Sequence, residues 1–440
     1  MRQYDNDMRN HCKKIAIKLF RLIYSVLFYC ALPLILVRLL WRSRKLPGYR
    51  KRWGERFGFI DLPASAQHGV WIHSVSVGET VAAALLIKSI QQCYPDLPIV
   101  VTTMTVTGSE RVKTLLGDTV FHRYVPYDLP CAVKRFLKCV QPKLLVLMET
   151  ELWPNLLHYT HRASIPIVLA NARLSEKSAC NYERVSWVTQ SMLSQLSCVA
   201  AQAKEDADRF CRLGADKNKV QITGNIKFDL SLPSNLETEA QALKKQLGEQ
   251  RLIFIAASTR EGEEVYILEA FARIKAKLPE CLLLLVPRHP DRFSMVADLC
   301  RARGYQIALR SARQSCDEKT DIFLGDSMGE MLLFYRVSDV VFVGGSLLPY
   351  GGQNVLEPAV LGRAIIVGPH TFNFTEAVRL LKDAQAIEIV ATADALADKV
   401  IRFLEDQALR SSYGDRAKQV VEKNRGAVAK HMVILKQLLL

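Results

Sequence analysis

The chain has 440 residues, of which 49% are apolar and 23% charged, so it is a folded protein too long for one small core. Its 11 cysteines show no CxxC or Cys/His spacing, which does not indicate a zinc site and favours reduced thiols in a cytosolic compartment. The net charge is +15, and residues 1–60 hold 14 Lys and Arg side chains against three acidic ones. Because the rest of the chain is nearly balanced, the basic charge belongs to one local surface that meets either nucleic acid or anionic lipid.

The first predicted element is an apolar helix. Residues 22–37 carry no charge, although this run is slightly short of the roughly 20 residues that span a bilayer upright. Many basic residues follow between Arg38 and Arg56, and no small-residue cleavage site follows, so we expect an uncleaved anchor with this flank in the cytoplasm. A helix lying in the membrane interface is the alternative, because basic residues also precede the run.

Two alternating series of strands and helices follow the anchor. The first runs from about residue 69 to 230 and the second from about residue 247 to the carboxyl terminus. Strands separated by helices predict parallel sheets, and therefore two Rossmann-like domains facing a cleft. We expect these boundaries: an anchor with its basic flank (1–48), a first domain (49–230), a polar linker (231–246) and a second domain that includes the terminal helices (247–440).

Polar side chains in the first domain follow the predicted strands. The apolar run 69–72 breaks through His73 and two serines into a helix that begins at Glu79. At the carboxyl edge of a sheet such a carboxylate can act as a general base, while the ordinary alternative is a first-turn acid that suits the helix dipole. Glu149 follows another apolar strand and is expected beside Glu79, where paired acids raise one pKa. Lys227, near the end of the domain, is either solvated or holds an anionic substrate.

The second domain carries glycine-rich turns at the ends of its strands. Gly344-Gly345-Ser346 follows one strand and Gly351-Gly352 precedes a helix, so we expect a ligand loop whose N–H groups meet a phosphate, against the alternative of ordinary turns. Neither GxGxxG nor GxxxxGK[ST] occurs, which indicates neither NAD binding nor a P-loop. Arg288 and the turn 325–330 follow two further strands, so all three turns should meet at one edge of the sheet.

Six motifs together closely resemble the bacterial 3-deoxy-D-manno-octulosonic acid (Kdo) transferases of lipopolysaccharide assembly. They are Lys51-Arg-Trp-Gly-Glu-Arg-Phe-Gly58, His73-Ser-Val-Ser-Val-Gly-Glu79, Met148-Glu-Thr-Glu-Leu-Trp-Pro-Asn155, Ala170-Asn-Ala-Arg-Leu-Ser175, Val286-Pro-Arg-His-Pro290 and Gly368-Pro-His-Thr-Phe-Asn-Phe374. The resemblance covers essentially the whole chain, with about a dozen extra residues before the anchor.

The resemblance implies a GT-B glycosyltransferase that moves Kdo, with inversion, from CMP-Kdo to a lipid A precursor (lipid IVA). It implies an acceptor site in the first domain, CMP-Kdo mainly in the second, and neither a cofactor nor a catalytic metal. The anchor would hold the enzyme at the cytoplasmic face of the bacterial inner membrane. Residues 38–56 would then meet the acceptor phosphates and anionic lipids, and no nucleic acid is expected as a partner.

The resemblance also implies roles for individual residues. Glu79 would be the proton acceptor, and Glu149 and Lys227 would stabilise the transition state. The residues expected to hold CMP are Pro287, Arg288, Met328, Gly329, Glu330, Asn354, Val355, Leu356 and Glu357. Val355 departs from the proline usual in the family, which a backbone contact would tolerate, and His73 receives no role.

Two other functions compete with this interpretation. A membrane-associated GT-B enzyme that uses a UDP-sugar would share the fold, and release of CMP or UDP separates the two. A membrane-bound nucleic-acid binder would share the basic charge, but that charge is confined to the membrane-proximal stretch and lacks interleaved aromatic side chains. The number of Kdo units added is not set by the sequence.

Overall fold

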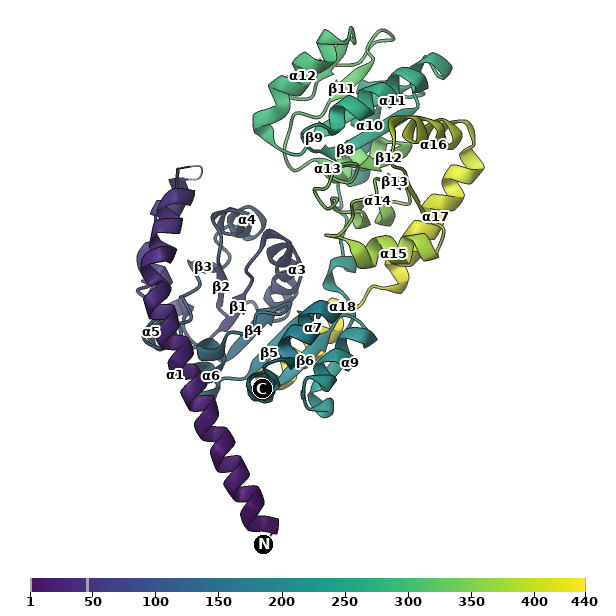
Figure 1. The fold of residues 1–440 in the computed structure, drawn as a ribbon. Helices are drawn as coiled ribbons and strands as arrows, with labels where there is room; N and C mark the ends of the chain where they lie inside the picture. Colours follow the sequence, from purple (N-terminus) through teal and green to yellow (C-terminus); the bar gives the residue numbers. More distant parts are fainter. Residues whose placement is uncertain (1, 45–46, 440) are drawn as a thin grey trace. The chain divides into compact units, whose positions relative to one another are not determined.

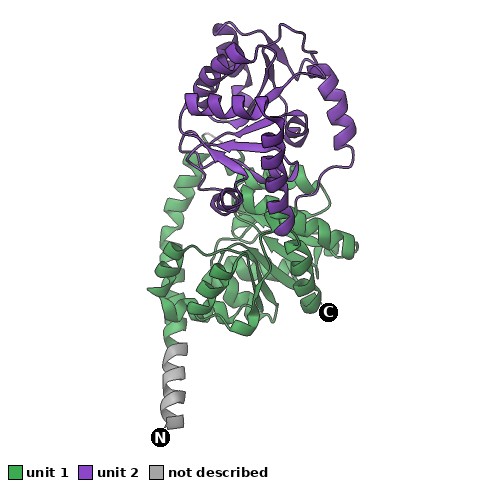
Figure 2. Cartoon of the chain, turned by 90° about the vertical axis from the view of Figure 1, so that its right-hand side faces the viewer, with its two compact units in different colours: residues 1–229, 425–440 green, residues 230–424 purple. Residues whose placement is uncertain are grey.

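The structure, a computed structural model, describes residues 2–44 and 47–439, with the side chains of residues 15–44 and 48–439. Lys45 of the basic segment therefore lies outside the described residues. The chain forms two compact units, one of residues 1–229 with 425–440 and the other of residues 230–424 (Figure 2).

The first unit is a seven-stranded parallel sheet with helices on its faces (Figure 1). Its strands, in the spatial order β3-β2-β1-β4-β5-β6-β7, are β1 (Val70–His73), β2 (Ile99–Thr103), β3 (Phe121–Tyr124), β4 (Leu144–Met148), β5 (Ile167–Ala172), β6 (Cys198–Ala201) and β7 (Val220–Ile222). β1 and β4 are buried at every position, and such strands form because a parallel sheet covered on both faces needs continuous apolar runs.

The helices of the first unit alternate with these strands. They are α1 (Arg2–Arg42), α2 (Trp53–Arg56), α3 (Val77–Cys93), α4 (Val106–Leu116), α5 (Pro130–Val140), α6 (Pro154–Arg162), α7 (Glu176–Glu183), α8 (Ser186–Ser194), α9 (Lys204–Arg212) and α18 (Ala427–Leu439). Short 3-10 turns are η1 (Pro47–Arg50), η2 (Ala64–Ala66), η3 (Lys217–Lys219) and η4 (Ile226–Phe228).

The strand order of the first sheet reverses next to β1. β2 lies on one side of β1 and β4 on the other, with His73 paired to both Thr102 and Leu147. The loops that follow β1 and β4 therefore diverge at a topological switch point, where α/β proteins bind their ligands.

The second unit repeats this design with a second seven-stranded parallel sheet. Its strands, in the order β10-β11-β9-β8-β12-β13-β14, are β8 (Ile253–Thr259), β9 (Leu282–Pro287), β10 (Ile307–Leu309), β11 (Ile322–Leu324), β12 (Val340–Val343), β13 (Ala364–Val367) and β14 (Ile387–Ile389). Its helices are α10 (Leu236–Leu247), α11 (Glu263–Lys277), η5 (Pro290–Arg292), α12 (Phe293–Ala302), α13 (Met331–Val337), α14 (Leu356–Val360), α15 (Thr375–Asp383), α16 (Ala393–Glu405) and α17 (Gln407–Lys423). The expected α/β class with two Rossmann-like domains is confirmed.

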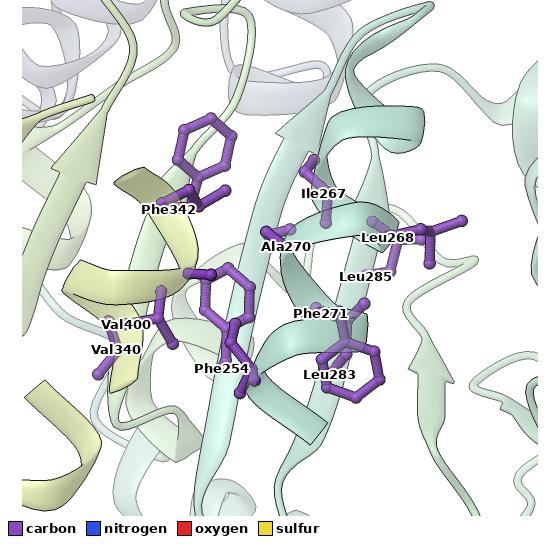
Figure 3. Packing of buried hydrophobic residues seen from close by; sticks show 14 of the residues in the cluster. Phe254, Ile267, Leu268, Ala270, Phe271, Leu283, Leu285, Val340, Phe342 and Val400 are labelled. Atoms are coloured by element: carbon purple, nitrogen blue, oxygen red, sulfur yellow. The ribbon is translucent and has the colours of Figure 1, made fainter. Parts of the chain in front are cut away.

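The core of the second unit lies between its sheet and the helices α11 and α16. Figure 3 shows Phe254 and Leu283 of the sheet packed with Phe271 of α11 and Val400 of α16. All four side chains are fully buried. Truncating such a phenylalanine to alanine costs about 3–5 kcal/mol, so this core holds the strand ends at the carboxyl edge in fixed positions.

The N-terminal helix α1 is long and lies against the first unit. By length and composition, its segment Ile15–Arg42 is long and apolar enough to cross a membrane. One face of this helix nevertheless packs on the unit, where Phe28 and Leu39 join a cluster with Tyr127 and Ala132. Figure 1 shows α1 running beside α5 and α6.

Several elements differ from the sequence-based expectation. The terminal helix α18, expected in the second domain, packs into the core of the first unit through Ala427, Ile434 and Leu435. The expected linker 231–246 is mostly the helix α10, whose apolar face is buried. Hydrophobic periodicity predicts a helix but does not say which core it covers, and α7, α8 and β14 are too short or too polar to stand out.

Candidate active site

Glu79 lies in the first turn of α3, directly after the carboxyl end of β1. Ser76 Oγ accepts a hydrogen bond from the Glu79 backbone N–H at 3.3 Å and donates one to Glu79 Oε1 at 2.7 Å. The Val75 backbone N–H donates to Glu79 Oε2 at 2.7 Å. This reciprocal pattern is a variant of the capping box in which the carboxylate reaches the N–H of the residue before the cap, so Glu79 does have the ordinary role of a helix-start acid. A carboxylate offers about four acceptor positions, however, so it can still accept a bond from a substrate hydroxyl.

The environment of Glu79 also tunes its acidity. The residue is only 7% exposed. Burial raises the pKa of Glu79 to about 7, although the hydrogen bonds from Ser76 and Val75 lower it. The neighbouring charges of Glu149 and Glu151 raise it further. A general base works best when its pKa is close to the working pH, so this carboxylate is suited to removing a proton from a hydroxyl group.

Glu149 and Lys227 meet at the same edge of the sheet. The backbone of Glu149, one residue after β4, has a left-handed φ of 56°, which costs of order 1–3 kcal/mol for a residue with a side chain. Lys227 Nζ donates to Glu149 Oε1 at 3.0 Å, and both side chains are about a quarter exposed. An ion pair with this exposure contributes at most about 1 kcal/mol to stability. The strained turn therefore contributes more to the position of the Glu149 carboxylate than to stability.

Two neighbours of these residues have structural partners. Glu151 accepts a hydrogen bond from the Trp153 indole N–H at 2.8 Å. His73 is fully buried against the Trp153 ring, and burial lowers its pKa to about 4. His73 Nδ1 lies 3.0 Å from Thr102 Oγ1, while Nε2 has no hydrogen-bond partner in the described part of the chain. His73 is therefore a neutral, packed histidine in this structure.

In the second unit, two predicted nucleotide-binding residues lie near Tyr335. Burial raises the pKa of Tyr335 well above its usual value, the Glu357 charge adds to the rise, and the Arg288 charge opposes it. Both charges are thus close to this buried ring of α13. Pro287 is buried as the last residue of β9, whereas the Arg288 side chain is exposed beyond it. The structure therefore places the cation of β9 and the carboxylate of α14 in one neighbourhood.

The turn 325–330 is held by a partner that the sequence does not reveal. Arg310 donates to both carboxylate oxygens of Glu330, with the shortest distance 2.6 Å from Nη2 to Oε1. Ser327 Oγ also donates to Glu330. Met328 and Gly329 stand exposed between these bonds, and Gly329 has a left-handed φ of 88°. The turn thus exposes the backbone of Met328 and Gly329, while Arg310 and Ser327 fix its glutamate.

The glycine-rich loop after β12 is filled by a side chain of the protein itself. The carboxylate of Glu263 accepts hydrogen bonds from the backbone N–H groups of Gly345, Ser346 and Leu347 at 2.6 to 2.9 Å, and from Arg260 at 2.8 Å. These N–H groups are therefore not available to a phosphate, which corrects the expectation for this loop. Gly344 is needed because a Cβ there would lie 2.8 Å from the Thr259 backbone.

The predicted residues 354–357 form the start of α14. Asn354 Oδ1 accepts from the Leu356 N–H at 3.1 Å, and Asn354 Nδ2 donates to Glu357 Oε1 at 3.0 Å. Val355 is 1% exposed, so its side chain is part of the core and only its backbone can meet a ligand. Among the residues whose side chains are described, no three His, Cys, Asp or Glu side chains are grouped to hold a metal ion.

The structure brings the predicted residues together within each unit. The first unit joins Glu79, Glu149 and Lys227, and the second joins Arg288 and Glu357 near Tyr335. Ser76, Glu263 and Arg310 were not predicted. The Ser-x-x-Glu spacing of a capping box gave a signal for Ser76, whereas the partners of Glu263 and Arg310 are distant in the chain and left no local signal.

Comparisons with known proteins agree with this division into units. The family model described as 3-deoxy-D-manno-octulosonic-acid transferase (kdotransferase) matches residues 51–230, and the model for glycosyl transferases group 1 matches residues 236–420. A 3-deoxy-D-manno-octulosonic acid transferase from Haemophilus influenzae is 45% identical over 95% of this chain and 98% of its own length. The corresponding protein from Bordetella pertussis is 35% identical over 92% of this chain and 96% of its length.

Solved structures show the same fold at low identity. A glycosyltransferase from Rickettsia africae superposes with a TM-score of 0.54 at 14% identity, covering 85% of this chain and 99% of that one. HepE from Anabaena in complex with UDP gives a TM-score of 0.54 at 13% identity, covering 84% of this chain and 99% of that one. At this identity the likeness concerns the fold alone, a glycosyltransferase architecture with two Rossmann-like domains.

Proposed function

Because the chain belongs to the 3-deoxy-D-manno-octulosonic acid transferase family, we propose that it transfers Kdo from CMP-Kdo to the lipid A precursor lipid IVA. The observation that carries the proposal beyond family membership is the Glu79 carboxylate. It lies at the switch point of the first sheet with a pKa raised to about 7 by burial, beside a lysine–glutamate pair. A sugar hydroxyl needs such a base when it attacks an anomeric carbon.

In the proposed reaction the acceptor hydroxyl attacks the anomeric carbon of Kdo and the bond to the CMP phosphate oxygen breaks. The hydroxyl proton moves to Glu79, and CMP leaves with the electron pair of the broken bond. Attack opposite the leaving group inverts the anomeric configuration. Two bonds to Glu79, from Ser76 and Val75, hold the carboxylate in one orientation, so the base is positioned before the substrate arrives.

Lys227 and Glu149 are proposed to stabilise the transition state. Negative charge develops on the departing phosphate, and a fixed ammonium group lowers the energy of that charge. Glu149 holds the Lys227 ammonium at 3.0 Å and keeps it from swinging into solvent. Because both side chains remain about a quarter exposed, the ammonium still has donor hydrogens for a substrate oxygen.

The second unit is proposed to hold CMP. The exposed Arg288 guanidinium suits a phosphate, since its planar fork can donate two parallel bonds. The backbone of Met328 and Gly329 can approach the nucleotide closely, and Glu357 can accept bonds from ribose hydroxyls. The loop 344–346 takes no part in binding phosphate in this proposal, because Glu263 occupies its N–H groups.

The enzyme is proposed to work at the cytoplasmic face of the bacterial inner membrane. Residues 38–56 were expected to meet the acceptor phosphates and anionic lipids, and the structure narrows that set. Arg56 is only 2% exposed and stacks on Tyr124 at 4.3 Å, and Arg52 pairs with Glu55 at 2.7 Å. The exposed cations left to meet anionic groups include Arg38, Arg42, Arg44, Arg50 and Lys51.

The purified full-length chain tests this proposal with CMP-Kdo and lipid IVA in detergent. Mass spectrometry of the lipid should show one or more added Kdo units, with an equal number of CMP molecules released. Transfer from a UDP-sugar with release of UDP, and none from CMP-Kdo, would assign the enzyme to the competing class. Salt-sensitive binding of an oligonucleotide by a chain without residues 1–60 would instead support nucleic-acid binding.

A further inference from the structure

The N-terminal helix α1 has two different apolar faces. One face is exposed, and the six most exposed of its large side chains are between 54% and 74% exposed: Leu19, Leu22, Leu27, Leu34, Val37 and Trp41. The other face packs on the first unit through Phe20, Phe28, Leu32, Ile35, Leu36 and Leu39. At about 3.6 residues per turn, the two sets fall on opposite halves of the helix, so each forms a stripe along it.

Polar contacts fix the packed face. Ser25 is buried, and its Oγ accepts a hydrogen bond from Asn155 Nδ2 at 3.1 Å. Asn155 is held in turn by Asp128, which accepts its backbone N–H at 3.0 Å through a carboxylate oxygen. A buried polar chain of this kind requires that α1 stay docked on α6, because separation would leave these groups without partners.

The docked length decides how α1 can meet a bilayer. Contacts run from Phe20, whose ring lies 5.5 Å from that of Trp187, to Leu39. At 1.5 Å per residue this is about 28 Å of helix axis, nearly the full thickness of a bilayer core. If α1 crossed the membrane, the neighbouring helices would enter the hydrocarbon together with exposed charges such as Lys134 and Arg162. Charged side chains facing lipid at that depth are strongly unfavourable.

We infer that α1 lies in the plane of the membrane and inserts its exposed stripe into a single leaflet, without crossing. The occupant of the stripe is lipid rather than a second copy of the chain, because exposed cations flank it at Lys18, Arg38 and Arg42. Trp187 and Val185, both exposed next to the start of the stripe, extend the apolar surface. An amphipathic helix with basic flanks binds anionic interfaces in this orientation.

This inference rests on the membrane association in the proposed function, and topology tests it separately from catalysis. The full chain carries an epitope tag at each end, and protease is added to sealed spheroplasts and to inverted membrane vesicles. Helix α18 brings the carboxyl terminus back to the first unit, so an in-plane α1 leaves both tags on one side, cleaved together or protected together. Opposite accessibility of the two tags would overturn the inference.

Substitution of the stripe gives a second measurement. Leu27→Glu with Leu34→Glu should weaken binding to vesicles that contain phosphatidylglycerol by at least about tenfold, since two charges would enter the leaflet. Turnover on detergent-dispersed acceptor should stay within about twofold, which separates failure here from failure of the proposed function. Met295→Glu with Val265→Glu, at exposed apolar positions of the second unit, is the matched control. Lipid as the occupant would be contradicted if the α1 variant bound vesicles as tightly as the original chain. It would also be contradicted if the variant lost a dimer that the original chain forms, with vesicle binding unchanged.

A different observation concerns the loop that carries Lys227. Asn171, at the end of β5, has a left-handed φ of 52°, and its Oδ1 accepts the Ile226 backbone N–H at 3.0 Å. The Asn171 backbone N–H donates to His431 Nε2 at 2.9 Å, and His431 Nδ1 donates to the Ala427 carbonyl at 2.7 Å. Both Asn171 and His431 are fully buried. The terminal helix α18 is thereby linked, through Asn171, to the residue that precedes Lys227.

The other end of the same loop is also tied to α18. The Asp229 carboxylate accepts the backbone N–H groups of Gly426 at 2.6 Å and Val428 at 2.5 Å. Helix α18 also packs on α3, the helix that begins next to Glu79. One element therefore supports both the proposed base and the proposed ammonium group.

We propose that Asn171 and His431 are positioning residues that set the place of Lys227 relative to Glu149 and Glu79. A displacement of about 1 Å at a reacting centre can cost about 100-fold in rate. His431→Leu removes the acceptor for the Asn171 N–H and should lower kcat 10- to 100-fold, with the KM for CMP-Kdo within about twofold. His431→Gln, whose amide oxygen can accept the same bond, should recover most of that loss.

A destabilised control separates positioning from folding. Leu268→Ala, in the core of the second unit, should lower the melting temperature at least as much as His431→Leu while keeping kcat per folded molecule close to the original. Equal kcat losses in the two variants, or no recovery by His431→Gln, would overturn the positioning role. Where His431→Leu fails to fold, Asn171→Ala removes the acceptor for the Ile226 N–H and should lower kcat by the same 10- to 100-fold, and a kcat within about twofold of the original would overturn the positioning role.

Discussion

Replacing Glu79 by glutamine should abolish transfer and, at alkaline pH, make the protein more stable. The amide keeps the size of the side chain but cannot take a proton from the acceptor hydroxyl. General base catalysis typically contributes about 10²–10⁴-fold, so kcat should fall by that factor while CMP binding in the second unit is unchanged. In the original protein, kcat/KM should rise with pH and level off above about 7, following the pKa of Glu79.

The expected change in stability follows from the direction of the pKa shift. Burial raises the pKa of Glu79 from 4.5 to about 7, so between these values the folded state binds more protons than the unfolded state. The free energy of unfolding therefore falls as pH rises through this interval, by up to about 3 kcal/mol at 1.36 kcal/mol for each pH unit. Glutamine does not ionise and avoids this cost, but it can accept only one of the bonds from Ser76 and Val75, which costs about 1 kcal/mol.

The net expectation for Glu79→Gln is about 2 kcal/mol of added stability at pH 8 and about 1 kcal/mol of lost stability at pH 4. Urea unfolding of the full chain at the two pH values, with the Ser76→Ala variant as a control for the cap alone, measures both. Ser76→Ala should lose stability at both pH values. Retention of more than a tenth of the turnover, or equal stability changes for Glu79→Gln at both pH values, would refute Glu79 as a base tuned by burial.

Three further variants test the surroundings of the two sites. Lys227→Met should lower kcat by about 10²–10³-fold. It should cost less than about 1 kcal/mol in stability, because the ion pair of Lys227 is partly exposed. Near-normal kcat under saturating CMP-Kdo would contradict the proposed role of Lys227. Glu263→Gln should cost about 3 kcal/mol in urea unfolding, since an amide cannot accept all four N–H groups that the carboxylate holds. The KM for CMP-Kdo should stay within about twofold, because the loop that Glu263 fills does not bind phosphate in the proposed site, and a tenfold higher KM would contradict this. Arg310→Met should raise the Kd for CMP about tenfold in calorimetry by releasing Glu330, and a Kd equal to that of the original chain would remove Glu330 from the nucleotide site.

Much of the fold could be predicted from the sequence because parallel strands buried on both faces need unbroken apolar runs. β1, β4 and β9 lie where such runs occur, and the polar residues after them, Glu79, Glu149 and Arg288, lie at the carboxyl edge of their sheets. The short strand β14 and the polar helix α7 had no comparable signal. For α18 the pattern predicted a helix, but the choice of core depends on contacts 260 residues apart, such as His431 to Asn171.

The residue types of the candidate site could be predicted from the sequence, but the pKa of Glu79 and the hydrogen bonds of the loop 344–346 could not. Spacing placed Glu79 in the first turn of a helix and left its two interpretations open. The structure shows the hydrogen bonds of a helix-start acid, and these bonds are compatible with the proposed role as a base. Its raised pKa depends on burial and on the charges of Glu149 and Glu151, which only the folded sheet brings near. The loop 344–346 resembles a phosphate loop in sequence, yet Glu263, some 80 residues earlier, fills it.

The most direct test of the central claim is mass spectrometry of lipid IVA after incubation with CMP-Kdo and either the original chain or Glu79→Gln. We expect the original chain to add Kdo to the lipid and to release CMP. The variant should add no Kdo in the same time, although it still binds CMP. Kdo transfer by Glu79→Gln at a rate close to that of the original chain would contradict the assignment of Glu79 as the catalytic base.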